Sequence, residues 1–149
     1  MKKIRVYCVL NLIFLFSCAS PSVPMDGLAQ DQDAKQFHSL ADKSRIYIYR
    51  ESAFVASAVK VPISIDNKLV GQSVVSTFFV LDIAPGEHQI GCLATDNSEV
   101  NILVKKGEIA YVRNQATGGA FGPGCEIQEV TADVAQPAIL KTKRARAKF

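Results

Sequence analysis

The sequence predicts an all-β fold, a small antiparallel β-sandwich that follows an N-terminal signal segment and a tether. Between residues 45 and 112, apolar and polar residues alternate with a period of two, which is typical of strands with one buried face. Turn-forming residues separate these strands, and no helix-length segment lies between them. Because a sheet that buries one face needs a second sheet to cover it, these two observations predict a sandwich.

The first 17 residues have the features of a secretory signal peptide. Lys2, Lys3 and Arg5 precede an apolar run from Val6 to Phe16 that is interrupted only by Asn11. The run is too short to cross a hydrocarbon layer, which needs about 20 residues. We therefore predict a lipoprotein signal peptide over residues 1–17 that is absent from the mature protein.

The end of this segment, Leu15-Phe16-Ser17-Cys18, resembles the bacterial lipobox. The resemblance implies that Cys18 carries lipid, becomes the first residue of the mature chain and anchors it to a bilayer. The ordinary signal peptidase is the alternative, because Ser17, Cys18 and Ala19 satisfy its small-x-small rule and it would cut after Ala19. A buried structural cysteine is disfavoured because the hydrophobic run beside it has no partner pattern. We expect lipidation.

Residues 18–44 are polar, contain scattered prolines and show little periodicity. They predict a tether that lifts the domain off the bilayer, with a weak signal for a short helix around Ala34 to Leu40. Ala19 and Ser20 follow Cys18 with no aspartate, as in lipoproteins that are sorted to the outer membrane. We therefore expect an outer-membrane lipid anchor whose protein part faces the periplasm.

Six or seven short strands are expected in the domain. Their alternating apolar residues are Ile46 and Ile48 within 45–50, Val61, Ile63 and Ile65, Phe79, Leu81 and Ile83, Ile90 and Cys92, Val100, Ile102 and Val104, and Ala110 and Val112. Turns are predicted at Asp66-Asn67-Lys68, Pro85-Gly86, Asp96-Asn97-Ser98, Lys105-Lys106-Gly107 and the glycine-rich stretch 118–124.

The C-terminal region differs from the strands. Thr131 is placed to cap a helical turn over Ala132 to Ala135, and Pro137 is expected to disturb its continuation. Residues 141–149 contain five cations and are predicted to be a solvated basic tail that is dispensable for folding. Such a tail either adds adhesion to anionic envelope material or only keeps the chain end soluble.

Length and charge limit the classes of function. Without the signal peptide 132 residues remain, enough for one domain, which we place at residues 45–140. The chain has a formal net charge of +3, but residues 18–140 hold 9 Lys and Arg against 14 Asp and Glu. An acidic body with a basic end is not the charge pattern of a nucleic-acid-binding domain, and export also argues against that partner.

The cysteines predict one disulfide. Cys8 leaves with the signal peptide and Cys18 is the anchor, so Cys92 and Cys125 remain in the domain. Export places this pair in an oxidising compartment, and their strand parity points both sulfur atoms inward, so a bridge between the sheets is predicted. Two buried free thiols are the alternative, because sequence does not place the two Cα atoms. No CxxC or Cys/His cluster indicates zinc, and we predict no metal and no cofactor.

Four sequence blocks follow one another along the domain. They are RIYIYR at 45–50, VPISIDNKLVG at 61–71, FFVLDIAPGEH at 78–88 and KGEIAYVR at 106–113. In this order they resemble the bacterial family called domain of unknown function 2846, over about residues 44–130. The Pro-Gly-x-His element also resembles PEGA and carboxypeptidase-regulatory-like modules. The resemblance implies a small sandwich of the prealbumin or PEGA type, often found on lipoproteins, with no established reaction.

Few side chains are candidates for chemistry or contact. His88 follows a Pro-Gly turn and is expected to hydrogen-bond backbone rather than act as a metal ligand or a base. His38 is expected to be solvated in the tether. The 118–124 loop lacks the Lys-Ser/Thr ending of a phosphate-binding loop, and Phe121 within it is a candidate contact for a partner, or else folds back over the core.

These observations favour a non-enzymatic, membrane-anchored lipoprotein of the bacterial envelope with a β-sandwich that serves as a binding or assembly module. The alternative is an accessory or structural subunit of a larger envelope complex, such as a secretion apparatus, because exposed sheet edges can pair with a partner strand. A hydrolase is the least favoured class, since the chain lacks a nucleophile elbow, an HExxH helix and a paired-carboxylate motif.

Overall fold

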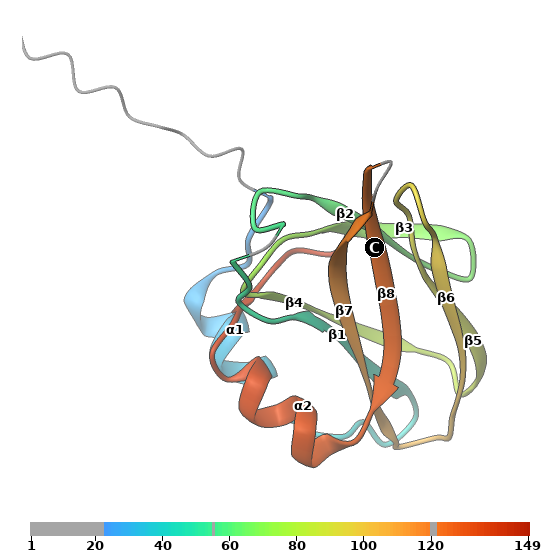
Figure 1. The fold of residues 1–149 in the computed structure, drawn as a ribbon. Coiled ribbons are helices and arrows are strands. Elements are labelled where there is room, and N and C mark those ends of the chain that lie inside the picture. The colour runs from blue at the N-terminus through green and yellow to red at the C-terminus, as the bar shows by residue number, and fades with distance from the viewer. Residues whose placement is uncertain (1–22, 55, 120–121) are drawn as a thin grey trace, which may run out of the picture.

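The computed structural model describes residues 23–54, 56–119 and 122–149. Nine strands and two short helices follow one another along this part of the chain (Figure 1). The elements are α1 (Leu28–Ala34), β1 (Ser44–Arg50), β2 (Val61–Ile65), β3 (Lys68–Ser73), β4 (Thr77–Ile83), β5 (Gly86–Cys92), β6 (Ser98–Val104), β7 (Ile109–Gly119), β8 (Gly122–Val130), α2 (Ala132–Ile139) and β9 (Lys143–Arg144).

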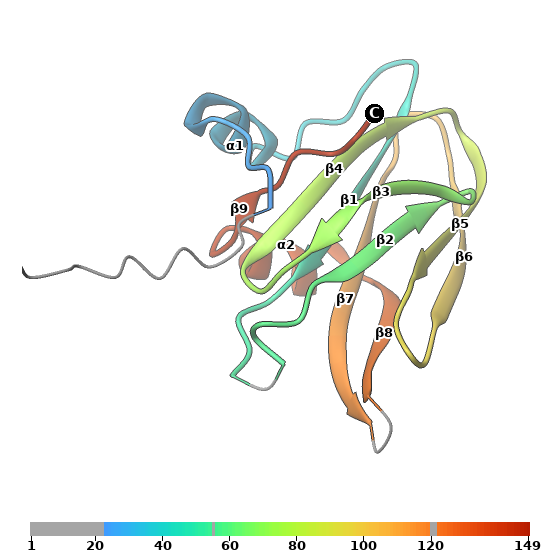
Figure 2. The ribbon, with the colours of Figure 1, turned by 90° about the horizontal axis from the view of Figure 1, so that it is seen from above.

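The strands form two sheets that pack face to face, which confirms the predicted all-β sandwich (Figure 2). One sheet has five strands in the order β8-β7-β1-β4-β9, and the other has four in the order β3-β2-β5-β6. Most neighbours are antiparallel, as predicted, but β1 pairs with β7 and β4 pairs with β9 in parallel. These two parallel pairs join segments far apart in sequence. No turn motif connects their strands directly, so the local sequence does not predict the pairing.

The main core lies between the sheets and follows the predicted alternation. Ile46 and Ile48 of β1 face Ile63 of β2 and Ile90 of β5, and all four side chains are fully buried. The predicted turn after β2 is also present, with Asp66 at φ 49° and Asn67 at φ 62°. Positive φ at two successive residues is the requirement of a tight hairpin turn, and Asp and Asn tolerate it better than most residues.

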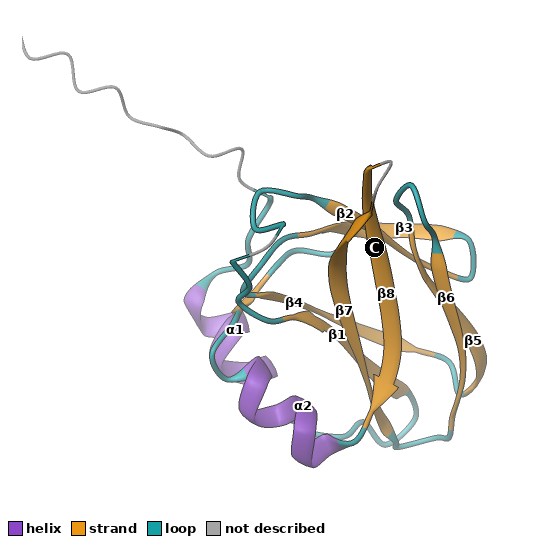
Figure 3. Ribbon diagram, in the orientation of Figure 1, coloured by secondary structure: helices purple, strands orange, loops and turns teal. Residues whose placement is uncertain are grey.

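A second core covers the outer face of the five-stranded sheet. Tyr47 of β1 stacks on Tyr111 of β7 with ring centroids 5.5 Å apart, and Phe78 of β4 completes the aromatic layer. Ala135 and Ile139 of α2 pack on this layer. The two helices therefore lie together on one side of the molecule, away from β5 and β6 (Figure 3), and β1 is buried on both faces.

The helices differ from the sequence predictions in extent. The short helix expected around Ala34 to Leu40 lies earlier in the chain, because α1 begins at Leu28 and ends at Ala34. At the other end, α2 continues through Pro137 to Ile139. A proline at this point removes only a bond to the carbonyl of Asp133, in the first turn of the helix. Burial of Ile139 against the aromatic layer offsets that loss.

The predicted tether at residues 18–44 is wrong over its described part, because the chain packs on the sandwich from residue 23 onward. Val23 and Ala34 are buried, and Met25 forms a β-bridge with Ala145. The phenolic O–H of Tyr47 donates to the carbonyl of Ala34 over 2.6 Å. Polar composition concealed this packing, since only a few small or apolar residues make the contacts.

The predicted solvated tail at residues 141–149 is also wrong. β9 pairs with β4, the amide of Ala145 donates to the carbonyl of Phe78 over 2.8 Å, and the amide of Lys148 donates to the carbonyl of Val70 over 2.9 Å. Ala145 is 1% exposed. The tail thus satisfies backbone groups at the edges of β3 and β4. Its lysines and Arg146 are exposed, whereas Arg144 is partly buried. The sandwich therefore extends beyond the predicted 45–140.

Candidate functional site

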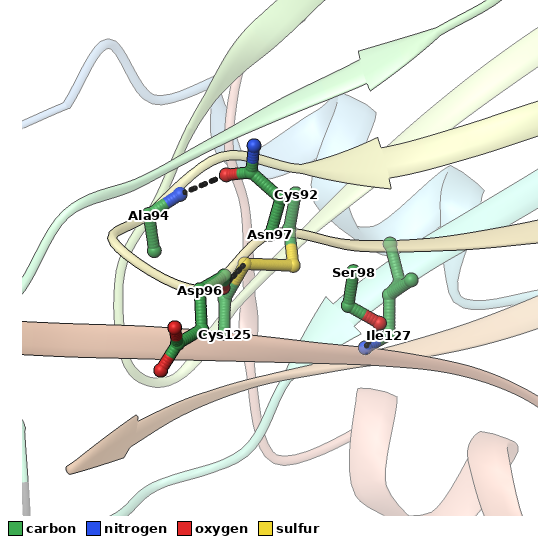
Figure 4. Close-up of a disulfide and its surroundings, with 7 residues drawn as sticks. All are labelled: Cys92, Ala94, Asp96, Asn97, Ser98, Cys125 and Ile127. Carbon is green, nitrogen blue, oxygen red and sulfur yellow. Dashed lines mark hydrogen bonds between the residues drawn. A yellow bond between two sulfur atoms is a disulfide. The ribbon is translucent and has the colours of Figure 1, made fainter. Parts of the chain in front are cut away.

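The predicted Cys92–Cys125 disulfide is present and joins the two sheets (Figure 4). Cys92 ends β5 of the four-stranded sheet and Cys125 lies in β8 of the five-stranded sheet. Their Cα atoms are 6.2 Å apart and the sulfur atoms 2.10 Å apart. Both residues are buried, as are Ile90 and Ile127 two positions away, so the inward strand parity predicted from the sequence is confirmed.

The turn after Cys92 is hydrogen-bonded to β8. The amide of Cys125 donates to the carbonyl of Asp96 over 3.1 Å, and the amide of Thr95 donates to the carbonyl of Pro123 over 3.0 Å. The amide of Ile127 donates to the hydroxyl of Ser98 over 3.3 Å, as Figure 4 shows. This side of the sandwich is therefore closed by one covalent bond and by backbone contacts around it, which we call the disulfide seam.

An open groove of about 600 Å³ lies on the four-stranded sheet, where β5 and β6 run beside the β2–β3 turn. Charged and amide residues form most of its lining, together with two aliphatic residues of β6. The lining residues are Asp66, Glu87, His88, Gln89, Asn101, Ile102 and Leu103. His88 and Asp66, two of these lining residues, have shifted pKa values.

His88 connects two loops through its ring nitrogens. Its Nδ1 lies 2.7 Å from Oδ2 of Asp66, and its Nε2 lies 2.9 Å from the carbonyl oxygen of Ala84. The second oxygen of Asp66 accepts from the amide of Gln89 over 3.0 Å. Carboxylate and carbonyl oxygens only accept, so both nitrogens donate at once only in the imidazolium form. We call this arrangement the His88 clip.

The electrostatics of the clip match its geometry. Burial works to lower the pKa of His88, but the hydrogen bonds to Asp66 and to the carbonyl of Ala84 outweigh it and the pKa is raised. For Asp66, burial works to raise the pKa, while the bonds from His88 and the amide of Gln89 lower it overall. As an imidazolium with both N–H groups engaged, His88 has no free lone pair for a metal or for proton abstraction.

The remaining predicted site residues have different positions. Cys18 and Phe121 lie outside the described residues. His38 is exposed, as expected for it, and its carbonyl accepts from Nη1 of Arg45 over 3.0 Å. Over residues 23–54, 56–119 and 122–149, no group of three or more His, Cys, Asp and Glu side chains is arranged to hold a metal ion.

Arg50 is a buried cation that the sequence reading did not single out. Its side chain is 2% exposed, and its guanidinium donates to the carbonyls of Val59 and Ala56, each over 2.8 Å. A longer contact of 3.4 Å reaches the carbonyl of Ser73. Burial lowers the pKa of Arg50. The signal was its parity with Ile46 and Ile48, which places Arg50 on the inner face of β1.

Within the described part of the chain, neither helix has the length and apolar character needed to cross a membrane.

Comparisons with known proteins identify relatives of the chain. The family model described as "Protein of unknown function (DUF2846)" matches residues 40–124, which include β1 to β7 and the start of β8. An uncharacterized protein of Haemophilus influenzae is 34% identical over 135 residues, covering 89% of this chain and 79% of the relative. The likeness to the relative therefore extends over more of the chain than the family model does.

Proposed function

The chain belongs to the DUF2846 family of proteins of unknown function, and from this premise we propose that it is a non-enzymatic, membrane-anchored lipoprotein of the bacterial envelope. Its sandwich acts as a binding or assembly module. The family supplies no activity, so the proposal depends on the N-terminal sequence and on the chemistry of the folded domain. The finer likeness to PEGA modules also remains a proposal.

The observation that carries the proposal is the disulfide between the two sheets. Cys92 and Cys125 are buried and bonded, and bonds of this kind form and persist in oxidising compartments such as the periplasm. A signal peptide over residues 1–17 would deliver the chain to that compartment. Two independent features, one at the N-terminus and one in the core, thus support export.

The lipobox-like segment before Cys18 supports an acyl anchor. Ala19 and Ser20 after it favour the outer membrane, with the domain in the periplasm. The clip favours a structural role for His88 over general-base catalysis, because both ring nitrogens are bonded to acceptors. We therefore rank a hydrolase last.

One observation favours the alternative, a subunit of a larger envelope complex. β6 is an edge strand of the four-stranded sheet, and Leu103 on it is 60% exposed beside the open groove. An edge strand with an exposed aliphatic side chain can accept a partner strand. Phe121 remains a second proposed contact.

Acyl labelling tests the anchor. Radiolabelled palmitate should enter the wild-type protein and not the Cys18→Ser variant, and the mature mass should correspond to a chain that begins at an acylated Cys18. Equal labelling of both proteins would contradict lipidation at this residue. A mature mass beginning at Ser20 would instead indicate the ordinary signal peptidase.

Crosslinking in intact cells tests the role of the domain. A stoichiometric set of partners, lost in a Leu103→Glu variant and kept in a variant with the same change at the exposed Leu140, Leu140→Glu, would indicate a subunit of a complex. Capture of no partner, together with turnover of an ester or peptide substrate by the purified protein, would contradict both non-enzymatic readings.

A further inference from the structure

The folded domain begins much closer to the proposed lipid anchor than the sequence predicts. Val23 is already buried against the sandwich, so only residues 19–22 separate it from Cys18. An extended chain spans at most about 3.6 Å per residue, which places Val23 within about 18 Å of Cys18. A domain of this size has a radius of gyration of about 14 Å. A connection this short limits how far the domain can turn its Val23 side away from the bilayer.

The surface around Val23 combines the N-terminal segment with the C-terminal tail. The amide of Asp26 donates to the carbonyl of Arg144 over 3.1 Å, and the amide of Arg146 donates to the carbonyl of Pro24 over 2.8 Å. In Figure 2 the blue start of the described chain, α1 and β9 lie on the same side of the molecule. We call the surface formed by residues 23–28, Leu69 and residues 143–149 the anchor-proximal face.

Cations exceed free acids on this face. Lys143 and Lys148 are exposed, and neither forms an ion pair with another described residue. Asp26 is already engaged, since its carboxylate contacts Nε of Arg144 and Nε of Arg146, each at 3.0 Å. The side chain of Arg146 is nevertheless 64% exposed.

The neighbouring acid, Asp31, is engaged as well. Its Oδ2 lies 2.7 Å from Nζ of Lys35, and its Oδ1 accepts from the amide of Arg144 over 2.7 Å. The face therefore presents a surplus of positive charge, whereas residues 18–140 as a whole carry more acids than bases. A molecule with this asymmetry orients its basic side toward an anionic surface.

Apolar side chains lie among these cations. Leu28 is 72% exposed, Phe149 61% and Leu69 39%. Two shallow grooves of about 290 and 320 Å³ flank the Met25–Ala145 bridge, the first rimmed by Leu69, Arg146 and Lys148 and the second by Leu28 and Lys143. Cations interleaved with exposed aliphatic and aromatic side chains are typical of surfaces that lie at the boundary of headgroups and acyl chains.

We propose that the anchor-proximal face rests on the anionic phospholipid surface of the membrane that holds the lipid anchor, with Lys143, Arg146 and Lys148 on phosphate groups and Leu28 and Leu69 at the acyl boundary. This inference rests on the proposed lipidation of Cys18. It orients the domain so that the edge strand β6, which lies on the other side of the molecule from α1 and β9 in Figure 2, faces away from that membrane, toward the periplasm and its proteins.

A tryptophan reporter tests the orientation, because the chain contains no Trp. Three single variants, Leu28→Trp, Leu69→Trp and Leu103→Trp, are purified from membranes as the full mature protein. Each is reconstituted in vesicles of phosphatidylglycerol and brominated phosphatidylcholine, whose bromine atoms quench only nearby indole rings. Mass spectrometry first establishes acylation of each sample, and thermal unfolding establishes that it is folded.

We expect strong quenching at positions 28 and 69 and little at position 103. Charge is tested in the Leu28→Trp background by Lys143→Glu with Lys148→Glu, and by the matched reversal Lys105→Glu with Lys106→Glu in the β6–β7 turn. Each cation contributes measurably to attraction at an anionic surface, so the first pair should reduce quenching by about half or more. The second pair should leave quenching unchanged.

The outcomes separate the two proposals. An acylated protein with equal quenching at all three positions, or with the strongest quenching at position 103, overturns the orientation and leaves the lipoprotein proposal standing. Quenching that is unchanged by both charge reversals overturns the proposed contact between the cations and the lipid phosphates. A protein without acyl groups overturns the anchor itself, and the orientation falls with it.

Discussion

The two open sides of the sandwich are closed in different ways. At the disulfide seam, one covalent bond joins Cys92 to Cys125, and backbone bonds between the 93–97 turn and β8 surround it. At the opposite side, residues 143–148 bridge the edges of β3 and β4 with hydrogen bonds and ion pairs, and we call this closure the tail seam. The first seam resists denaturant as long as the bond stays oxidised, whereas the second depends on many weak contacts acting together.

The contrast shows that the side of a sandwich can be closed by a covalent bond between strands or by a further segment that hydrogen-bonds to the strand edges. Both seams satisfy backbone groups that would otherwise be open to another molecule. The disulfide seam depends on two cysteines, and a pair of cysteines in an exported domain predicts a disulfide by itself. The tail seam uses a segment whose composition resembles a solvated end, and its role appears only when its amides are followed to their acceptors.

Deletion of residues 141–149 should have the largest effect on stability. The tail amides of Lys143, Ala145 and Lys148 donate to carbonyls of the strand region and that of Arg146 to Pro24, and each such bond contributes about 1 kcal/mol. With the burial of Ala145 lost as well, we expect the free energy of unfolding in urea to fall by about 4 to 5 kcal/mol.

A matched substitution shows whether charge or backbone holds the tail. Lys148→Gln removes a cation but keeps the amide that donates to Val70, so it should leave the urea midpoint unchanged. A deletion variant as stable as the wild type would show that the tail seam does not stabilise the fold.

Removal of the disulfide should have the next largest effect. The bond closes a loop with a sequence separation of 33, and in the chain-entropy model a loop of this length stabilises the folded state by about 3 to 4 kcal/mol. The double variant Cys92→Ala with Cys125→Ala should lose that amount in urea unfolding. Reductant should destabilise the wild type and have no effect on the double variant. Two thiols alkylated in the native, unreduced protein would contradict the bond.

The ion pairs of the tail seam should contribute less. Asp26→Ala leaves Arg144 and Arg146 without their carboxylate, and we expect a loss of about 1 kcal/mol because Asp26 and Arg144 are largely shielded from solvent. The control is Asp42→Ala at the exposed pair with Lys106, which should leave the thermal midpoint unchanged. Equal losses of stability in the two variants would show that the ion pairs of the tail seam contribute no more than an exposed surface pair.

The His88 clip should have the smallest effect and is the one that titrates. The pKa of His88 is raised from 6.5, so its stabilisation is complete below pH 6.5 and is lost as pH rises through the folded-state value. The pKa of Asp66 is lowered from 3.8, so its share is complete above pH 3.8 and is lost as pH falls through the folded-state value.

Stability measured against pH checks this window. The difference in unfolding free energy between wild type and His88→Gln should be largest between pH 3.8 and 6.5 and should remain below about 1 kcal/mol, because Asp66 is half exposed. The double variant Cys92→Ala with Cys125→Ala should show the same pH profile as the wild type in this range, because disulfide-bonded cysteines do not titrate. A constant difference at every pH would mean that His88 acts only by packing.

Much of the fold could be predicted from the sequence because its signals are local. Successive side chains of a strand point to opposite faces, so the alternating pattern predicts which residues are buried. The predicted residues Ile46, Ile48, Ile63 and Ile90 are all in the core. Asp66 and Asn67 announce a tight turn by the conformations they tolerate. The same parity predicted that Cys92 and Cys125 point inward, and an exported chain made their bond the default.

The candidate site was predicted only in part. The sequence suggested that His88 bonds backbone, and the bond to the carbonyl of Ala84 confirms it. Its second partner, Asp66, lies 22 positions away in another turn, and no local pattern relates the two. The strand parity of Arg50 predicts that it faces inward. Arginine is rarely buried without a carboxylate partner, so its residue type argued against that position.

The sequence by itself determined most of the strands, the turns, the inward cysteines and the family of this protein, since each is encoded in neighbouring residues or in ordered blocks. Six or seven strands were expected and nine are present over the described residues, and β9 lies in the segment expected to be a solvated tail. Only the tertiary structure decided that residues 23–44 and 141–149 belong to the domain. Their partners are the edges of β3 and β4 and the outer face of the five-stranded sheet, tens of residues away in sequence. Polar segments pack there because they meet unpaired backbone groups and an uncovered aromatic layer, and both exist only once the two sheets have formed.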